Sequence, residues 1–197
     1  MALSLISITA CSPNTNVEAT AKTKTVVQCD CELVKFDKNQ LVHEADVIVY
    51  GTVIAQEVQK DFGGLPATDT TLKVHSVYKG EPDDTVEIRV RGGEIDDMIY
   101  TIDEYMTPTF KIGEEAVVFL TSNKGTTPDK EDFGYYVVGQ SQGKFNTEAT
   151  DPQGLIYNQI GTHSFDFNNI QQEIDEIEEY NKVNNLQRLH SQKNHTP

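Results

Sequence analysis

The chain has 197 residues and a formal net charge of −15, with 31 acidic side chains against 16 Lys and Arg. That length fits one domain with appendages. So acidic a chain repels phosphate backbones, which excludes nucleic acid as an expected partner. No apolar stretch reaches the roughly 18–20 residues that span a bilayer. Three cysteines are too few for a disulfide-dense scaffold or a cysteine-rich zinc site.

Residues 1–11 form the first recognisable segment, and they resemble the end of a bacterial lipoprotein signal. An uncharged apolar run leads into Thr9-Ala10-Cys11, with small residues before the cysteine. The resemblance implies a diacylglyceryl group on the sulfur of Cys11, which would anchor the protein to a membrane. We therefore expect a lipid-anchored protein on the extracytoplasmic face of the cell membrane. The plainer alternative is an ordinary apolar N-terminus with a chance cysteine.

Residues 12–27 are small and polar, so we expect a flexible tether. A coil of about 16 residues reaches about 20–24 Å. Residues 28–150 are expected to form a β-barrel. Residues 151–189 are expected to form a C-terminal helical segment, and the polar residues 190–197 a disordered tail.

Residues 45–58 predict a long strand buried on both sides, because β-branched residues occupy both of its faces. Gly51 in its middle predicts a bulge or a bend. The two faces carry separate apolar sets: Val47, Val49 and Val53 on one, and Ile48, Tyr50 and Ile54 on the other.

Residues 70–78 and 85–91 alternate between apolar and polar, and the turn-forming run 79–84 joins them, so they predict a hairpin. In its second strand, Val86, Ile88 and Val90 should point inward and Glu87, Arg89 and Arg91 outward. Further strands are expected at residues 99–102, 115–121 (central in the sheet), 134–139 and 143–147.

The pattern changes period after Pro152. Ile170, Ile174 and Ile177 lie at i, i+4 and i+7, which predicts a helix with one apolar stripe that Tyr180 and Val183 could extend. Asn168 or Asn169 is the candidate N-cap. These elements together predict a mainly β fold: a small antiparallel OB-like barrel with a flanking C-terminal helix.

Several short motifs follow one another in a distinctive order: Cys29-Asp30-Cys31, Ala45-Asp46-Val47-Ile48, Val77-Tyr78-Lys79-Gly80, an apolar strand, and G-Y-Y-V-V-G-Q-S-Q-G-K-F at 134–145. This succession resembles the N-terminal domain of the tissue inhibitors of metalloproteinases, a netrin-like OB-fold, over residues 29–147. The chain is also similar to uncharacterised bacterial secreted proteins through Gly92-Gly93, Phe110, Gly113-Glu114, Phe119-Leu120 and the same 134–145 run.

The inhibitor resemblance implies a role for Cys29, because in that family the free amine and carbonyl of the first cysteine chelate the zinc of the protease. This chain departs from the pattern in two respects: Cys29 lies 18 residues after Cys11, and no cysteine follows Cys31. The C-x-C motif is then a structural remnant, a labile local disulfide or, least favoured, a metal ligand pair. We expect the partner to contact Cys29, Asp30, Cys31 and the adjoining turn, Tyr78, Lys79 and Gly80.

The remaining motifs give weaker evidence for a functional site. Gly139 to Gly143 matches G-x-S-x-G, and Asp151 and His163 follow in hydrolase order. A nucleophile elbow needs a helix after Ser141, whereas the sequence indicates a strand there, so we interpret the motif as a glycine-rich hairpin turn. An acidic loop at 94–104 could bind calcium only if its oxygens converge. The five histidines lack metal-ligand spacing, and His75 is expected to point outward.

The sequence thus predicts a monomeric, non-enzymatic surface lipoprotein without metal or cofactor, whose barrel binds a protein partner, with a protease as one candidate. The alternative is a barrel that binds a small or polymeric ligand such as an oligosaccharide. In that case exposed aromatics should share one face, with Tyr100, Tyr105 and Tyr136 as candidates.

Overall fold

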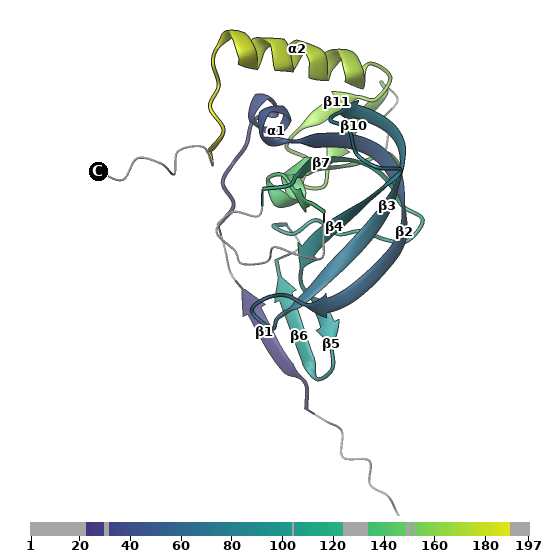
Figure 1. Cartoon of the computed structure of the whole chain (residues 1–197), viewed down its shortest axis with the longest axis vertical. Helices are drawn as coiled ribbons and strands as arrows, with labels where there is room; N and C mark the ends of the chain where they lie inside the picture. Colours follow the sequence, from purple (N-terminus) through teal and green to yellow (C-terminus); the bar gives the residue numbers. More distant parts are fainter. Residues whose placement is uncertain are drawn as a thin grey trace, which may run out of the picture.

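A computed structural model describes residues 23–29, 32–103, 105–123, 134–148, 151 and 153–189 (Figure 1). The fold is mainly β, with a C-terminal helix across one end, as the sequence predicts. The elements are β1 (Thr25–Cys29), α1 (Lys38–Glu44), β2 (Val47–Lys60), β3 (Pro66–Lys79), β4 (Thr85–Arg91), β5 (Gly93–Ile95), β6 (Met98–Ile102), β7 (Glu115–Thr121), β8 (Tyr136–Val137), the 3-10 helix η1 (Gln140–Gly143), β9 (Lys144–Asn146), β10 (Leu155–Asn158), β11 (Ser164–Asp166) and α2 (Ile170–Val183).

The larger sheet has the order β11-β10-β9-β7-β2-β3-β4, and β8 also pairs with β7. A parallel bridge between Ile88 of β4 and Tyr135 leads back toward β8. Its two hydrogen bonds run from the Tyr135 N–H to the Glu87 carbonyl and from the Arg89 N–H to the Tyr135 carbonyl, each 2.9 Å. The strands β2, β3, β4, β8 and β7 therefore surround one core in an OB-like order. This barrel is only partly closed, because β4 and β8 meet at one bridge and not along a ladder.

The first half of the long strand β2, residues 47–53, separates two cores, which confirms burial on both sides there; residues 54–57 are exposed, so the prediction is wrong for the second half of the strand. The barrel interior holds mainly valines and other aliphatic residues: Val47, Val49, Val53, Leu72, Val86, Ile88, Val90, Val118, Leu120 and Val137, with Phe110. The second core lies under the helices and is richer in aromatics: Leu41, Val42, Ala45, Ile48, Val117, Phe119, Val138, Phe145, Ile156, Phe165, Ile170 and Ile174. Ile54 belongs to neither, because it is 47% exposed.

Two local predictions on these strands can be compared with the structure. The register of β2 against β3 shifts at Gly51, as expected of a bulge, and a Cβ there would overlap the Lys73 carbonyl oxygen. The β3–β4 hairpin is also confirmed. Arg89, however, is buried and not exposed: its Nε and a terminal nitrogen each donate to Asp69 at 2.6 Å. These two charge-assisted hydrogen bonds allow the charged side chain to be buried.

Helix α2 confirms the predicted stripe, since Ile170 and Ile174 are buried in the second core. Ile177 is partly buried against the same core. The stripe ends after it, because Tyr180 and Val183 are exposed and Asn181 is buried in their place, its Nδ2 donating to the Asn39 carbonyl at 2.9 Å. The sequence analysis made no prediction for α1. Its start is a capping box, in which Asp37 and Gln40 each bond the other's backbone N–H.

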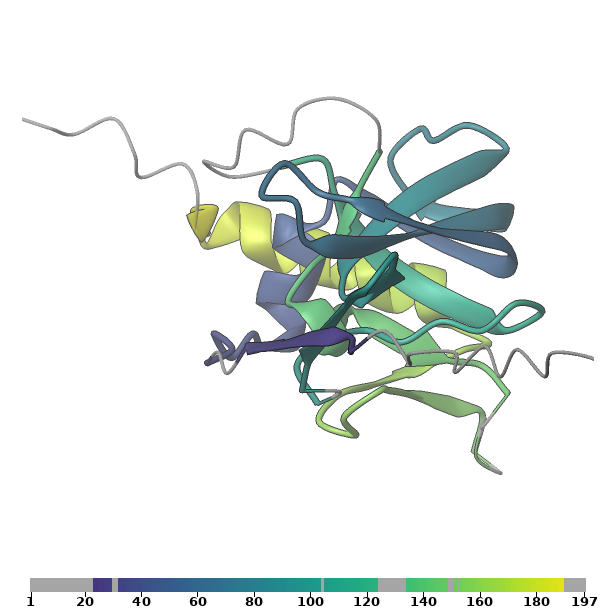
Figure 2. The same cartoon turned by 90° about the horizontal axis from the view of Figure 1, so that it is seen from below.

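Two predicted boundaries are wrong. Strand β1 begins at Thr25, inside the predicted tether, and joins β6 and β5 in a separate three-stranded sheet. Within the predicted helical segment 151–189, β10 and β11 form an antiparallel hairpin that packs Ile156 and Phe165 into the second core. Strands of three or four residues are too short to show a period in sequence. Viewed from below (Figure 2), α2 lies behind the strands, on the far side of the molecule from β1.

Candidate partner-binding groove

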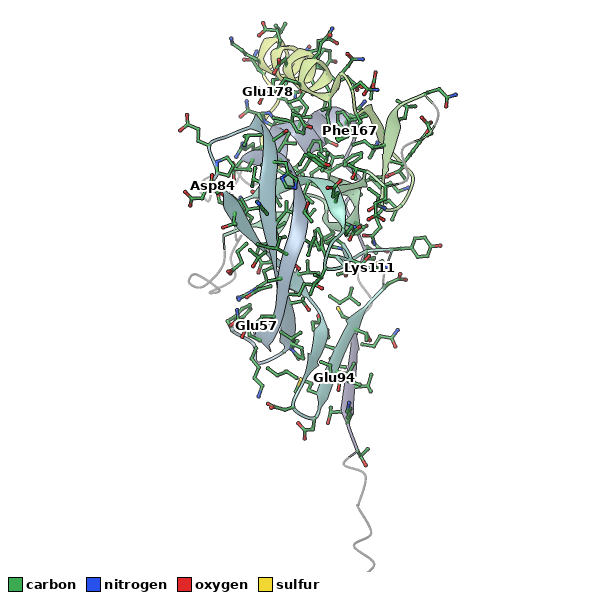
Figure 3. The ribbon with its side chains drawn as sticks, turned by 90° about the vertical axis from the view of Figure 1, so that its right-hand side faces the viewer. Glu57, Asp84, Glu94, Lys111, Phe167 and Glu178 are labelled. Carbon is green, nitrogen blue, oxygen red and sulfur yellow. The ribbon has the colours of Figure 1, made fainter. Side chains whose placement is uncertain are left out.

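The structure separates the residues that the sequence analysis grouped into one surface. Cys29 ends β1 and pairs with Ile102, whereas Lys79 ends β3, where its Nζ lies 2.9 Å from Glu178 of α2. The strand β1 adjoins the end marked by Glu94, and Figure 3 shows Glu94 and Glu178 at opposite ends of the molecule. The predicted contiguous surface is therefore wrong for Cys29 and Tyr78, Lys79 and Gly80. Cys11, Asp30 and Cys31 lie outside the described residues, and so does the predicted tail.

The segment that follows the C-x-C motif, residues 32–36, is held against the barrel by one side chain. The Oε1 of Gln142 accepts from the Phe36 N–H at 3.0 Å, and its Nε2 donates to the Val34 carbonyl at 2.8 Å. Gln142 is 4% exposed. Its amide thus makes the two bonds that a peptide group of a neighbouring strand would make. A third contact joins the Phe36 carbonyl to His163 Nε2 at 2.7 Å.

Gln142 belongs to η1, where the sequence analysis placed a hairpin turn between two strands. The strands β8 and β9 both pair with β7, β8 along its second half and β9 along its first. They are therefore two parts of one edge, interrupted by η1, and not a hairpin. The interruption needs left-handed backbone at Gly139 and Gln140, with φ of 60° and 57°.

The same geometry explains the G-x-S-x-G match. Ser141 is fully buried, and its hydroxyl donates to the Tyr105 carbonyl. Asp151 accepts from the backbone N–H groups of Gln153 and Leu155, while His163 bonds Phe36. The three side chains are each engaged elsewhere, so the motif holds the fold together at this point.

Lys144, which directly follows this motif, also has a structural role. Its side chain is 2% exposed and its Nζ donates to Glu114 and, at 2.9 Å, to Asn146 Oδ1. Burial lowers the pKa of Lys144, and the hydrogen bond to Glu114 opposes that shift. The residues that made the sequence distinctive are thus mostly inside the molecule.

A groove of about 620 Å³ opens beside residues 32–36, along the seam where β4 and β8 are not paired. Its walls are largely apolar, and the protruding side chains include Val34, 64% exposed, and Leu189, 44% exposed. The lining comprises Glu32, Leu33, Val34, Phe36, Glu44, Arg91, Thr121, Asn123, Tyr136, Val137, Val138, Gly139, Gln140 and Leu189. Its size is that of a ligand or peptide site.

The last described residues, which follow α2, form one rim of this groove. After α2, Asn185 turns with a φ of 49°, and the chain returns across α1. An Arg188 terminal nitrogen donates to Asp46 at 2.6 Å, and the Leu189 N–H donates to Glu44 at 2.7 Å. Burial would raise the pKa of Asp46, but hydrogen bonds from Arg188 and Ser122 lower it to about 2. We call residues 186–189 the strap.

The other candidate sites do not assemble as expected. In the acidic loop, Glu94 pairs with Lys24, and Asp96 with Lys60 at 2.9 Å. Within the described ranges, no three His, Cys, Asp or Glu side chains gather as metal ligands. Three tyrosines proposed for ligand stacking lie in different places: Tyr100 is buried, Tyr105 is 71% exposed, and Tyr136 lines the groove. His75 is exposed, as predicted, and bonds Thr52 Oγ1 at 2.6 Å.

Gln142, the segment 32–36 and Arg91 were not identified from sequence as parts of one site. The sequence offered only a weak signal for this site, namely the position of Gln142 in a short run flanked by two glycines. Comparison with protein-family models and with curated proteins finds no match for this chain. In the described part of the chain, neither helix has the length and apolar character needed to cross a membrane.

Proposed function

We propose that the chain is a non-enzymatic, lipid-anchored surface protein whose OB-like barrel binds a protein partner in the groove beside the C-x-C segment. One observation carries the proposal: Val34, on the wall of an apolar groove of about 620 Å³, is 64% exposed, whereas the valines of the barrel interior are buried. Exposed apolar surface in a hollow is typical of an interaction site. The lipoprotein-like Thr9-Ala10-Cys11 supplies the anchor in this proposal.

A protease is one candidate partner through the inhibitor resemblance, and the structure bears on how it would bind. Cys29 is the last residue of β1, and residues Thr25 to Cys29 pair with β6. A cleavage that freed the Cys29 amine for zinc would remove the rest of β1 and its ladder. Binding through the groove keeps β1 in place, so we favour contact without zinc chelation.

Site-specific photocrosslinking tests the groove. A photoreactive amino acid replaces Val34 in the full chain, and in a control it replaces Ile112, which is 67% exposed and does not line the groove. Cells that carry the protein are irradiated and the adducts are separated by mass. We expect a discrete protein adduct from position 34 and none from position 112. Equal adduct patterns from both positions, or none from position 34, would contradict the proposal.

Intact-mass spectrometry of the native protein, with and without thiol alkylation, tests the anchor. A lipid adduct on Cys11 with Cys29 still internal is the expected result. A mature chain that begins at Cys29 would contradict the anchor and restore zinc chelation as the binding mode.

A small polar ligand such as an oligosaccharide remains a second candidate, because a second cavity of about 290 Å³, which shares Arg91 with the groove, lies between β3, β4 and β6. Its lining is rich in hydroxyl groups: Thr68, Thr70, Tyr100, Thr101, Thr107 and Thr109, together with Gln56. Saturation-transfer NMR with chitotriose tests it. A signal that Thr101→Val removes is expected, and no transfer with the wild-type protein would eliminate this candidate for that sugar.

A further inference from the structure

We propose that the groove takes an extended, apolar peptide segment of the partner, which adds as a strand beside residues 33–35 and places one acidic side chain against Arg91. The inference rests on the proposed function, because it specifies how a protein partner would occupy the same groove. Three features of the described residues carry it: an open backbone edge, apolar walls and an arginine without an ion pair.

The open edge follows from the way Gln142 holds the segment. It occupies the Val34 carbonyl and the Phe36 N–H, which lie on one side of the segment because one amide group reaches both. In an extended chain the backbone groups of the intervening residues point to the other side. No hydrogen bond to the backbone groups of Leu33 or Lys35 occurs among the described residues. A row of unpaired N–H and C=O groups is a template for a strand from another chain.

The groove walls suit the side chains of such a strand. Val34 and Leu189 protrude, and Phe36, Val137 and Val138 line the hollow between them. Every second side chain of an added strand would face the same way. A peptide that alternates apolar and polar residues therefore covers these walls with its apolar set and keeps the other set in water.

Arg91 supplies the charge preference. It is the only Lys or Arg that lines the groove, it is exposed, and it forms no ion pair within the described ranges. Arg89, two residues earlier on β4, is buried and engaged with Asp69 at 2.6 Å. The fold thus uses one of the two arginines internally and leaves the other at the groove. A guanidinium pairs best with a carboxylate, in a two-pronged geometry.

The acidity of the whole chain makes this arginine selective. With a net charge of −15, the surface repels a polyanionic partner in general. A single carboxylate on an otherwise neutral, apolar peptide meets Arg91 with less of that penalty, although Glu32 and Glu44 also line the groove. A second copy of the chain would bring the same negative charge to the groove, so we do not favour it as the occupant.

Selection from a phage-displayed library of random heptapeptides tests the proposal on the immobilised full chain. Arg91→Glu serves for counter-selection. Lys111→Glu is the matched control, because it makes the same charge reversal at an exposed lysine outside the groove. We expect enriched peptides with alternating apolar residues and one Asp or Glu at a constant position.

A synthetic copy of the most enriched peptide then provides the quantitative test. We expect Arg91→Glu to weaken its affinity about 10-fold or more, and Lys111→Glu to leave it unchanged. Two versions of the peptide are then N-methylated, one at the odd and one at the even backbone nitrogens. Only one version should lose binding, since half of the N–H groups of an added strand face residues 33–35.

Several results would overturn the inference. These are the absence of enriched peptides, enrichment without an acidic position, equal effects of the two charge reversals, or concentration-dependent dimers that Val34→Ser abolishes. The failure of the inference is distinct from the failure of the proposed function. If the adduct at position 34 persists and Arg91→Glu leaves its yield unchanged, a partner binds the groove by another mode. If the adduct itself is absent, the proposed function fails.

Discussion

The paired wall of the barrel and the seam between β4 and β8 both contain valines, but these valines differ in their exposure to solvent. In the wall, β7, β2, β3 and β4 are joined by antiparallel ladders, and Val49 and Val53 are at most 1% exposed. At the seam one bridge replaces a ladder, and Val34 is 64% exposed. In our proposal, the paired backbone provides stability, and the seam, where the pairing stops, provides the binding surface.

The largest expected effect is a difference in the free energy of unfolding between a substitution in the core beside the wall and one at the seam. Phe119 of β7 is fully buried, with ring centroids of Phe145 and Phe165 at 5.2 and 5.4 Å. Phe119→Ala should lower the free energy of unfolding by about 3–5 kcal/mol, because it leaves a cavity. Val34→Ser should change it by less than about 0.5 kcal/mol, since this side chain is already in water. Urea denaturation measures both, and similar losses would abolish the distinction.

A medium effect is expected at Gln142, which joins the two regions. Gln142→Ala leaves the Phe36 N–H and the Val34 carbonyl without their partner and should cost about 2–3 kcal/mol. In the wild type, hydrogen exchange should be slow at the Phe36 amide and fast at the Lys35 amide. The variant should make both fast. Gln140→Asn, at an exposed neighbour, should leave the Phe36 amide slow; a Phe36 amide that exchanges fast in the wild type would refute the anchoring role.

The wall could be predicted from the sequence, and the seam could not. Alternation and β-branching in residues 45–58 and 85–91 report burial directly, because a strand in a ladder has a fixed period. The residues 32–36 have no such period, since a side-chain amide and not a strand holds them. Arg89 and Arg91 look alike in sequence, yet only the first meets Asp69. Long-range pairing of that kind is invisible to local pattern.

The candidate site shows the same limit. The C-x-C motif lies next in sequence to the proposed site, because the segment after it lines the groove. The Tyr78-Lys79-Gly80 turn does not line the groove, because β3 has 14 residues and carries that turn to the α2 end. The run 134–145 was distinctive for structural reasons: Ser141, Gln142 and Lys144 are buried polar residues whose partners must be in place. The sequence shows that such residues are unusual, but it does not distinguish a polar residue that bonds other residues of the protein from one that bonds a ligand.

The smallest expected effect concerns the strap, which borders the seam without being part of either ladder. Hydrogen bonds lower the pKa of Asp46 from 3.8 to about 2. The folded state therefore binds this proton less readily than the unfolded state, so the contribution is present above about pH 4 and is lost as the pH falls toward 2. Arg188→Ala should cost less than about 1 kcal/mol at pH 7, since its side chain is 41% exposed.

The same substitution should make the wild-type loss of stability between pH 4 and 2 shallower, and acid titration of the two proteins at fixed urea measures it. Hydrogen exchange at the Leu189 amide, which donates to Glu44, should quicken in Arg188→Ala while the Phe36 amide stays slow. That outcome would show that the strap opens locally while residues 32–36 stay in place. Parallel loss of protection at both amides would instead make strap and segment one cooperative unit, and the seam would then open only when the whole rim unfolds.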